Sequence, residues 1–299
     1  MSVVANPRIR IRFSKQGKVR FTSHRDVARI WERALRRVAL PVAYSEGFSP
    51  RPKISYGLAL PTGYASEGEY LDVELDREQA ESLGLVSQGI LGNPQDGLIG
   101  RLNQVLPVGI RAQAIAPVQP GSSSLQQAVV ACTWEFEVDA AGFDEVEAWV
   151  SRVLDADEII VERERKGKRV TDDVRPLVEA LEVGRGRCGT GGETVRVTAV
   201  LGTQPRALRP VELLEAMSVD PTAGPHPPLS ARTVCRMQQW TLRESQESQE
   251  SQESQESQES QESQESQQSM EDIKITQGDA RVEPLSVDAG PAALVETRV

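Results

Sequence analysis

The chain is poor in the residues from which metal centres and disulfide frameworks are built. Its 299 residues contain three cysteines, two histidines and 4% aromatic residues. Cys132, Cys188 and Cys235 are far apart and form no Cys-x-x-Cys pair, which argues against a disulfide framework and fits a reducing cytoplasm. Zinc sites and self-contained iron–sulfur clusters need ligands at spacings that this chain does not offer. We therefore predict neither a structural metal nor a bound cofactor.

Long apolar runs are also missing. No stretch approaches the ~18 apolar residues that a transmembrane helix requires. The segment Met1–Arg12 lacks the apolar region of a signal peptide. These two absences predict a cytoplasmic protein without membrane association.

Charge is distributed unevenly along the chain, whose 34 Lys and Arg against 44 Asp and Glu give a net charge of −10. Residues 1–56 contain 13 basic and 3 acidic residues, or +10, and residues 57–243 contain 18 and 27, or −9. Residues 244–299 contain 3 and 14, or −11. Without this last segment the charges nearly cancel, at 31 − 30 = +1. The overall acidity therefore hides a basic N-terminal end.

Hydrophobic patterning predicts two α+β units, residues 1–117 and 128–243, followed by a disordered tail, residues 244–299. In both units the expected order is strand, helix, strands, helix, strand. This order indicates largely antiparallel sheets and suggests two ferredoxin-like halves. Strands are expected at residues 8–13, 19–22, 40–44, 54–60, 69–75, 110–116, 129–138, 159–163, 170–181, 194–201 and 236–243.

The tail contains a tract of low complexity. From Glu244 to Gln267 the triplet Glu-Ser-Gln is repeated eight times. A period of three matches neither the 3.6 of a helix nor the 2 of a strand, and the tract has no apolar residue to bury. We therefore expect it to be disordered. Residues 273–299 have no sustained period either, and are expected to be disordered or to form a short docking peptide.

The first predicted helix, from about His24 to Val38, has two distinct faces. Ser23 is expected to be its N-cap, with Asp26 three residues later as a capping partner. An apolar stripe recurs at spacings of three and four residues, as in a helix that packs on a core. Five arginines gather on roughly the opposite face, with four of them within about 80° of one another. We call this set the arginine ridge: Arg25, Arg29, Arg33, Arg36 and Arg37.

Like charges at i,i+4 repel each other by a few tenths of a kcal/mol per pair. A ridge that persists against this repulsion suggests a polyanionic partner, and guanidinium groups match the oxygens of a phosphate well. The alternative is a solvated helix face whose arginines pair with acids elsewhere in the fold. Arg8, Arg10 and Arg12 alternate along the first strand, and predict either a second basic surface or charges that protect an exposed sheet face or edge.

The segment Tyr44–Tyr56 combines aromatic and basic residues, with Phe48 close to Arg51 and Lys53. Unpaired RNA bases are commonly stacked on aromatic rings beside cationic groups. The segment is therefore a candidate for base stacking. The alternative is a rigid connector in which Phe48 is buried in the core.

His24 is the one histidine in the basic region. It could serve as a general base, a phosphate contact or a hydrogen-bonding group near the helix start. Asp26 and Glu46 are its only local acidic candidates. If the protein is an enzyme, these three residues are its candidate catalytic groups. A structural role for His24 is the competing interpretation.

The N-terminal sequence resembles the radical-SAM-linked family, a bacterial domain of unknown function found alone or fused behind a radical S-adenosylmethionine domain. The resemblance is carried by Arg10–Asp26, Glu32–Arg37 and Tyr44–Pro52, is specific over residues 8–75, and is looser as far as Glu212. It implies an accessory role beside a radical-SAM enzyme and a connection to RNA processing. Because the chain lacks the Cys-x3-Cys-x2-Cys cluster motif, radical chemistry would require a partner enzyme in trans. Positions that match the family pattern include Ser23, His24, Asp26, Arg33, Arg36, Arg37, Glu46, Gly47 and Phe48.

Three functions are compatible with these features. The first is a non-catalytic RNA-binding accessory protein that presents RNA, with transfer or ribosomal RNA as candidates, to a modifying or processing enzyme. Its predicted RNA contacts are Arg25, Arg29, Arg33, Arg36, Arg37, Phe48, Arg51 and Lys53. The second is an enzyme that modifies or processes RNA, using His24 with Asp26 or Glu46. The third is a protein–protein adaptor whose basic surface docks on an acidic partner.

Overall fold

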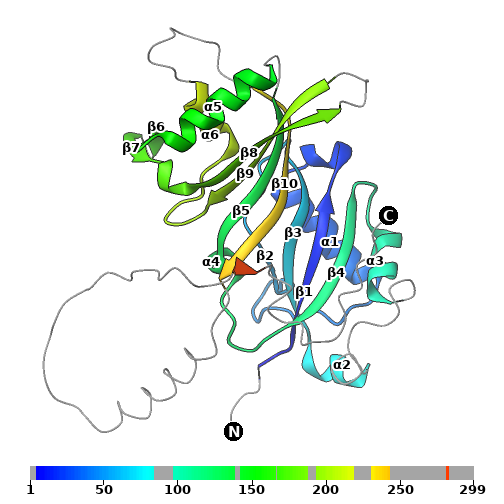
Figure 1. Ribbon diagram of the computed structural model, residues 1–299. Helices are drawn as coiled ribbons and strands as arrows, with labels where there is room; N and C mark the ends of the chain where they lie inside the picture. The colour runs from blue at the N-terminus through cyan, green and yellow to red at the C-terminus, as the bar shows by residue number, and fades with distance from the viewer. Residues whose placement is uncertain are drawn as a thin grey trace, which may run out of the picture.

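The computed structural model describes residues 5–83, 97–138, 142–165, 167–187, 193–218, 230–242 and 281–282. Over these residues the protein is α+β, as predicted, with a nine-stranded, largely antiparallel sheet and a separate two-stranded hairpin (Figure 1). None of the described helices is long and apolar enough to cross a membrane.

The first half of the sheet follows the chain order strand, helix, two strands, helix, strand. Its strands lie in the spatial order β4-β1-β3-β2, and each is antiparallel to its neighbour. Two short helical pieces, a 3₁₀ helix at Gly17–Phe21 and α2 (Arg77–Ser82), lie between the main elements. The main elements are β1 (Arg8–Lys15), α1 (His24–Arg37), β2 (Ile54–Tyr56), β3 (Ala65–Glu74), α3 (Leu98–Val105) and β4 (Ile110–Val118).

The second half repeats this arrangement. Its strands lie in the order β10-β5-β9-β8, again with antiparallel neighbours. The hairpin of β6 (Ile160–Arg165) and β7 (Lys168–Asp173) is inserted after the first helix, and α4 (Leu125–Ala128) precedes the half. The main elements are β5 (Val129–Val138), α5 (Phe143–Asp155), β8 (Val178–Arg187), β9 (Glu193–Gly202), α6 (Pro210–Ser218) and β10 (Ala231–Leu242).

In both halves the strands thus lie in the order fourth, first, third, second, which is the arrangement suggested by the predicted ferredoxin-like halves. The halves are not two separate sheets, because β10 continues the edge of β3 beyond the short strand β2. The contact is a parallel pairing of Cys235 with Ala65 and of Arg236 with Ser66. Gly68 allows the approach, since a Cβ there would lie 2.9 Å from the carbonyl oxygen of Met237. The boundaries predicted for the two domains stay a prediction.

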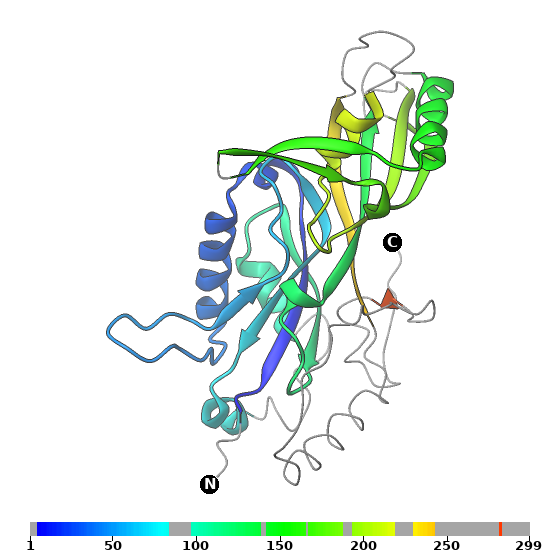
Figure 2. The ribbon, with the colours of Figure 1, turned by 90° about the vertical axis from the view of Figure 1, so that its left-hand side faces the viewer.

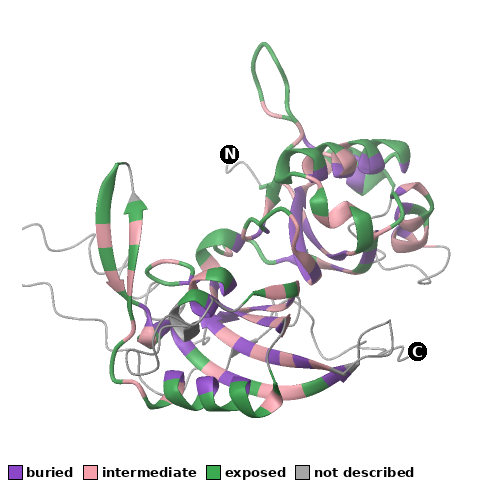
Figure 3. Cartoon of the chain, turned by 90° about the horizontal axis from the view of Figure 1, so that it is seen from above, coloured by how far each residue is buried: buried purple, intermediate pink, exposed green. Residues whose placement is uncertain are grey.

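Each half has its own buried hydrophobic cluster. In the first, residues of β1, β3 and β4 pack against α1 and α3, and in the second, residues of β5, β8 and β9 pack against α5 and α6. Figure 2 shows α1 and α5 on opposite sides of the molecule. Figure 3 shows the outer faces of the helices exposed and the strands beneath them largely buried. Burial of these apolar faces is the main force that holds the helices on the sheet.

Several predicted strands were wrong in detail. Residues 19–21 belong to the 3₁₀ helix and Thr22 is its C-cap. The buried Lys15 holds this turn through Nζ donation to the carbonyl oxygens of Arg20 and Thr22. Residues 40–44 form only single bridges, one from Val42 and one from Tyr44. Residues 170–181 are interrupted by a 3₁₀ turn, because Arg175 donates to the carbonyl oxygens of three other residues.

Most of the predicted tail lies outside the described residues, including the whole Glu-Ser-Gln tract. Within residues 244–299 the structure describes only β11 (Arg281–Val282), which pairs with Thr241 and Leu242 of β10. Of the three cysteines, Cys132 and Cys235 are free thiols, and Cys188 lies outside the described residues.

Candidate nucleic-acid interface

Helix α1 forms as its sequence predicts. The hydroxyl oxygen of Ser23 accepts a hydrogen bond from the Asp26 backbone N–H at 3.2 Å, and the same hydroxyl donates to the Asp26 carboxylate at 2.8 Å. This is a reciprocal N-cap. On the inner face Trp31 is fully buried, and its ring meets Phe13 of β1 edge-on with centroids 4.9 Å apart. The opposite face is therefore directed to solvent.

The arginine ridge lies on this outer face, and all five of its arginines are exposed. Arg29 Nη1 lies 3.3 Å from a carboxylate oxygen of Asp26, and both side chains remain more than half exposed. An ion pair in such a setting contributes about 0–1 kcal/mol and is easily exchanged. The other four guanidinium groups form no ion pair or hydrogen bond within the described part of the chain. Within the described residues, neighbouring acids therefore do not neutralise the ridge, apart from the pair between Arg29 and Asp26.

A hollow of about 380 Å³ runs between α1 and α3 beside the ridge. Arg33 and Arg37 form its basic side, and Val105 and Pro107 form its apolar side. Nearby, Arg101 of α3 donates to the carbonyl oxygen of Val38 at 3.3 Å, which ties the two helices together. The ridge thus borders a hollow with two guanidinium groups on one side and apolar side chains on the other.

The loop that follows α1 is an ordered projection. Tyr44 and Pro52 form an isolated bridge. The Ser45 backbone N–H donates to the Arg51 carbonyl oxygen, and the Ser45 hydroxyl oxygen accepts from the Arg51 backbone N–H. Gly47 adopts φ +119°, a conformation that strongly favours glycine. Figure 2 shows the loop extending away from the body on the same side as α1.

Phe48 lies in this projecting loop and is fully exposed. The alternative in which its ring is buried in the core is therefore wrong. Arg51 is exposed, and its side chain has no ion pair within the described residues. Lys53 differs, because its Nζ lies 2.7 Å from the carboxylate of Glu74. Phe48 and Arg51 are the two predicted contacts in the loop that stay open to a ligand.

The predicted basic face of β1 is not an open surface. Arg10 is buried and donates to both carboxylate oxygens of Asp72, at 2.8 and 3.0 Å. Arg8 donates to backbone carbonyl oxygens of Gln119 and Ser122. The strand lies between β3 and β4, inside the sheet, so edge protection does not explain these charges either.

The three candidate catalytic residues are not assembled into one site. His24 is exposed, and its ring meets that of Tyr56 edge-on with centroids 5.2 Å apart. The Asp26 carboxylate is already bonded by Ser23 and Arg29. Glu46 lies in the projecting loop, beside a different hollow. No hydrogen bond joins His24 to either carboxylate within the described residues.

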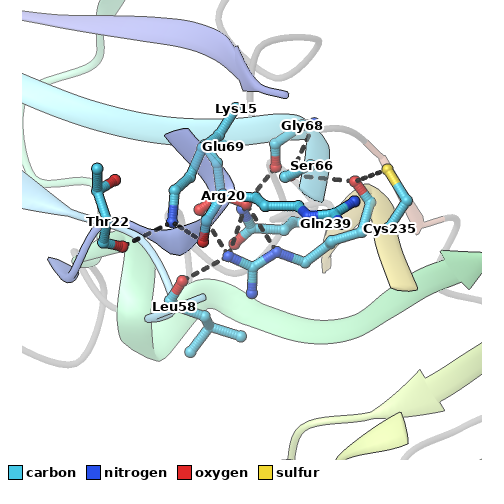
Figure 4. Close-up of polar contacts among 10 residues, drawn as sticks. Lys15, Arg20, Thr22, Leu58, Ser66, Gly68, Glu69, Cys235 and Gln239 are labelled. Carbon is cyan, nitrogen blue, oxygen red and sulfur yellow. Dashed lines mark hydrogen bonds and ion pairs between the residues drawn. The ribbon is translucent and has the colours of Figure 1, made fainter. Parts of the chain in front are cut away.

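The structure also contains a charged cluster that the sequence did not indicate (Figure 4). Arg236 of β10 is almost completely buried and donates to Glu69 of β3 through Nε and Nη2, at 2.6–2.9 Å. Figure 4 shows Lys15 and Glu69 pointing toward each other beside Leu58. Burial lowers the pKa of Lys15 below its ordinary value, while the charge of Glu69 opposes this shift. Glu69 and Arg236 are 167 residues apart, and only the pairing of the two halves brings them together.

Comparison with known proteins adds a family but no activity. Residues 8–210 match the model of a family described as an uncharacterized protein conserved in bacteria (DUF2344). The match includes α1, the projecting loop and most of both halves. No curated protein matches the chain.

Proposed function

The chain belongs to that uncharacterized bacterial family, DUF2344, and we propose that it is a non-catalytic RNA-binding accessory protein. In this proposal the arginine ridge binds backbone phosphates, and the projecting loop stacks an unpaired base on Phe48. The protein would act in the cytoplasm and present RNA to a modifying or processing enzyme. The resemblance of residues 8–75 to radical-SAM-linked proteins supports a radical-SAM enzyme as that partner in trans.

One observation carries the proposal. Four of the five arginines on a single face of α1 are exposed and have no carboxylate partner within the described residues. Phosphate contacts from such groups give most nucleic-acid binding proteins their affinity, because each one releases condensed counterions. The guanidinium fork also bonds two phosphate oxygens at once.

The exposed ring of Phe48 on the projecting loop favours RNA with unpaired bases over a fully double-stranded ligand. A ring that is exposed on a projecting loop can reach a base only if that base is unstacked. Stacking on aromatic side chains contributes about 1–3 kcal/mol per base and tolerates any sequence. Arg51 in the same loop could add a phosphate contact or stack on the neighbouring base.

The decisive variant reverses the charge of the ridge. Replacing Arg29, Arg33 and Arg36 by Glu should weaken binding to total transfer RNA by about 100-fold or more at low salt, because three contacts become three repulsions. Fluorescence anisotropy at several salt concentrations measures this loss and the salt dependence of the wild-type protein. Circular dichroism confirms that the variant is folded.

A matched control separates the ridge from net charge. Replacing Arg111, Arg152 and Arg169 by Glu makes the same change in net charge at exposed positions away from the ridge. This control should bind RNA within a few-fold of the wild-type protein. Equal losses in both variants would show that affinity follows net charge and would overturn the assignment to the ridge. A wild-type protein that binds no RNA at low salt would reject the function itself.

A further inference from the structure

A hollow of about 220 Å³ lies where the two halves meet. The segment after β2 contributes Leu58 and Ala59 on one side, and strand β5 contributes Cys132 and Trp134 on the other. Residues just before α6, with Arg209 among them, complete the wall. Ligand sites occur preferentially at such junctions between packed units.

Arg236 lies in the wall of this hollow and is held in place there. Its Nε and Nη2 atoms donate to Glu69, and Nη2 also donates to the Leu58 carbonyl oxygen at 2.6 Å. Its guanidinium group also forms a side-chain hydrogen bond with the Cys132 thiol in the wall of the hollow, while Nη1 donates to no oxygen within the described residues. The guanidinium carbon lies 5.4 Å from the centroid of the Trp134 ring, in a cation–π contact. The fold therefore presents a fixed, buried guanidinium edge beside an aromatic wall.

Positive charge is in excess around the hollow. Two arginines, Arg209 and Arg236, line it, and no Asp or Glu is among the lining residues. Glu69 lies behind Arg236, but the buried Lys15 also faces that carboxylate. The acid nearest to Arg209 in the chain, Glu212, accepts from the Arg209 backbone N–H at 2.9 Å and pairs with another arginine. An anion that enters the hollow would meet donors without a competing carboxylate in the wall.

The remaining walls are apolar except for Thr203, whose hydroxyl already donates to the Val129 carbonyl oxygen at 2.6 Å. Tyr64 meets the Trp134 ring edge-on, with centroids 6.0 Å apart. Leu201 and Leu208 are buried against the same space. Burial raises the pKa of the Cys132 thiol to about 11, so this group stays neutral and serves as part of the wall.

We propose that this hollow binds a small carboxylate with a flat apolar body, the carboxylate directed to Arg236 and Arg209 and the body against Trp134. Its volume is below the ~300–1,000 Å³ of sites for drug-sized molecules, which suits a ligand smaller than a nucleotide. This inference does not depend on RNA binding, because the arginine ridge contributes no residue to the hollow.

Phenylacetate is a suitable probe, and phenylacetamide has the same body without the charge. Isothermal titration calorimetry on the full chain should show saturable binding of phenylacetate, with phenylacetamide at least about tenfold weaker, since hydrogen bonds to charged groups are the strong ones. Equal affinities for the two probes would overturn the carboxylate assignment. No binding of either would overturn the site.

Two variants and one control locate the bound probe. Ala59 is exposed at the hollow, so Ala59→Trp should block entry and abolish phenylacetate binding, while Ala148→Trp on the exposed face of α5 should leave it unchanged. Arg209→Gln removes an exposed charge and should weaken binding about tenfold while leaving the fold intact. Unchanged binding in Ala59→Trp would place the probe elsewhere and reject the proposal. None of the three variants should alter RNA affinity, so this test and that of the ridge can fail independently.

Discussion

The two halves of the protein have the same strand order, but their first helices carry opposite charges. Helix α1 has five Arg against one Asp and one Glu, 5 − 2 = +3, and α5 has one Arg against two Asp and two Glu, 1 − 4 = −3. Both bury a tryptophan and small aliphatic residues against the sheet. The architecture therefore requires the apolar face and leaves the outer face free. The fold therefore does not require the positive charge of the ridge, because α5 holds the equivalent position with a negative outer face.

The buried ion pair between Glu69 and Arg236 joins the two halves. Breaking this pair tests whether the halves unfold as one unit. Arg236→Met leaves a buried carboxylate without its partner, which costs about 3–5 kcal/mol of stability. Urea unfolding followed by circular dichroism measures this loss. If the halves unfold independently, the variant should instead separate the transition into two steps.

Two further variants sharpen that result. Adding Glu69→Leu to Arg236→Met removes the orphaned charge and should recover much of the stability. Arg196→Met breaks a more exposed pair with Glu135, 3.4 Å apart in the second half, and should cost less than about 1 kcal/mol. A loss in Arg196→Met as large as that in Arg236→Met would contradict the role given to burial.

The next largest effect is expected in the projecting loop after α1, a position that the β6–β7 hairpin holds after α5 in the second half. Phe48→Ala should weaken RNA binding by about 1–3 kcal/mol, the range for loss of one stacked base. Its unfolding free energy should stay within about 0.5 kcal/mol of wild type, because the ring is fully exposed. Fluorescence anisotropy and urea unfolding measure the two quantities. Unchanged RNA affinity would show that the loop does not take part in binding.

The ridge and the capped helix could be predicted because they depend on local spacing. Ser23, Trp31 and the arginines are all positioned by one helical period. The loop conformation was only half predictable, since the sequence allowed Phe48 to be buried or exposed. The buried cluster could not be predicted, because Glu69 and Arg236 resemble ordinary polar positions on alternating strands. Their proximity depends on β10 continuing the edge of β3, which no local pattern encodes.

A smaller effect separates the two first helices at their N-termini. Ser23 caps α1 with its side chain, whereas Gly142 precedes α5 without a side-chain hydrogen bond. Ser23→Ala should therefore cost about 1 kcal/mol, and Gly142→Ser should gain only a few tenths. Thermal unfolding of both variants measures the difference. Equal and negligible shifts would show that the cap of α1 does not contribute to stability.

The smallest effect concerns acid stability, for which the two halves are expected to respond in the same direction. Burial raises the pKa of Glu74, but hydrogen bonds from Lys53 and Asn6, together with the charges of Lys53 and Arg8, outweigh it and lower the pKa below 4.5. The stabilisation is therefore present above pH 4.5 and is lost as the pH falls through the lower folded-state value. Glu74→Gln should be less stable than wild type at pH 7, by less than about 1 kcal/mol for this partly exposed pair, and equal to it in strong acid. Urea unfolding at pH 7 and pH 3 measures the convergence, and a constant difference between the two proteins would show that the carboxylate is not the source.

Asp173→Asn is the counterpart in the second half, where backbone N–H groups of Ile159 and Arg175 lower the carboxyl pKa. The stability of this variant should converge with that of wild type as the pH falls, as for Glu74→Gln.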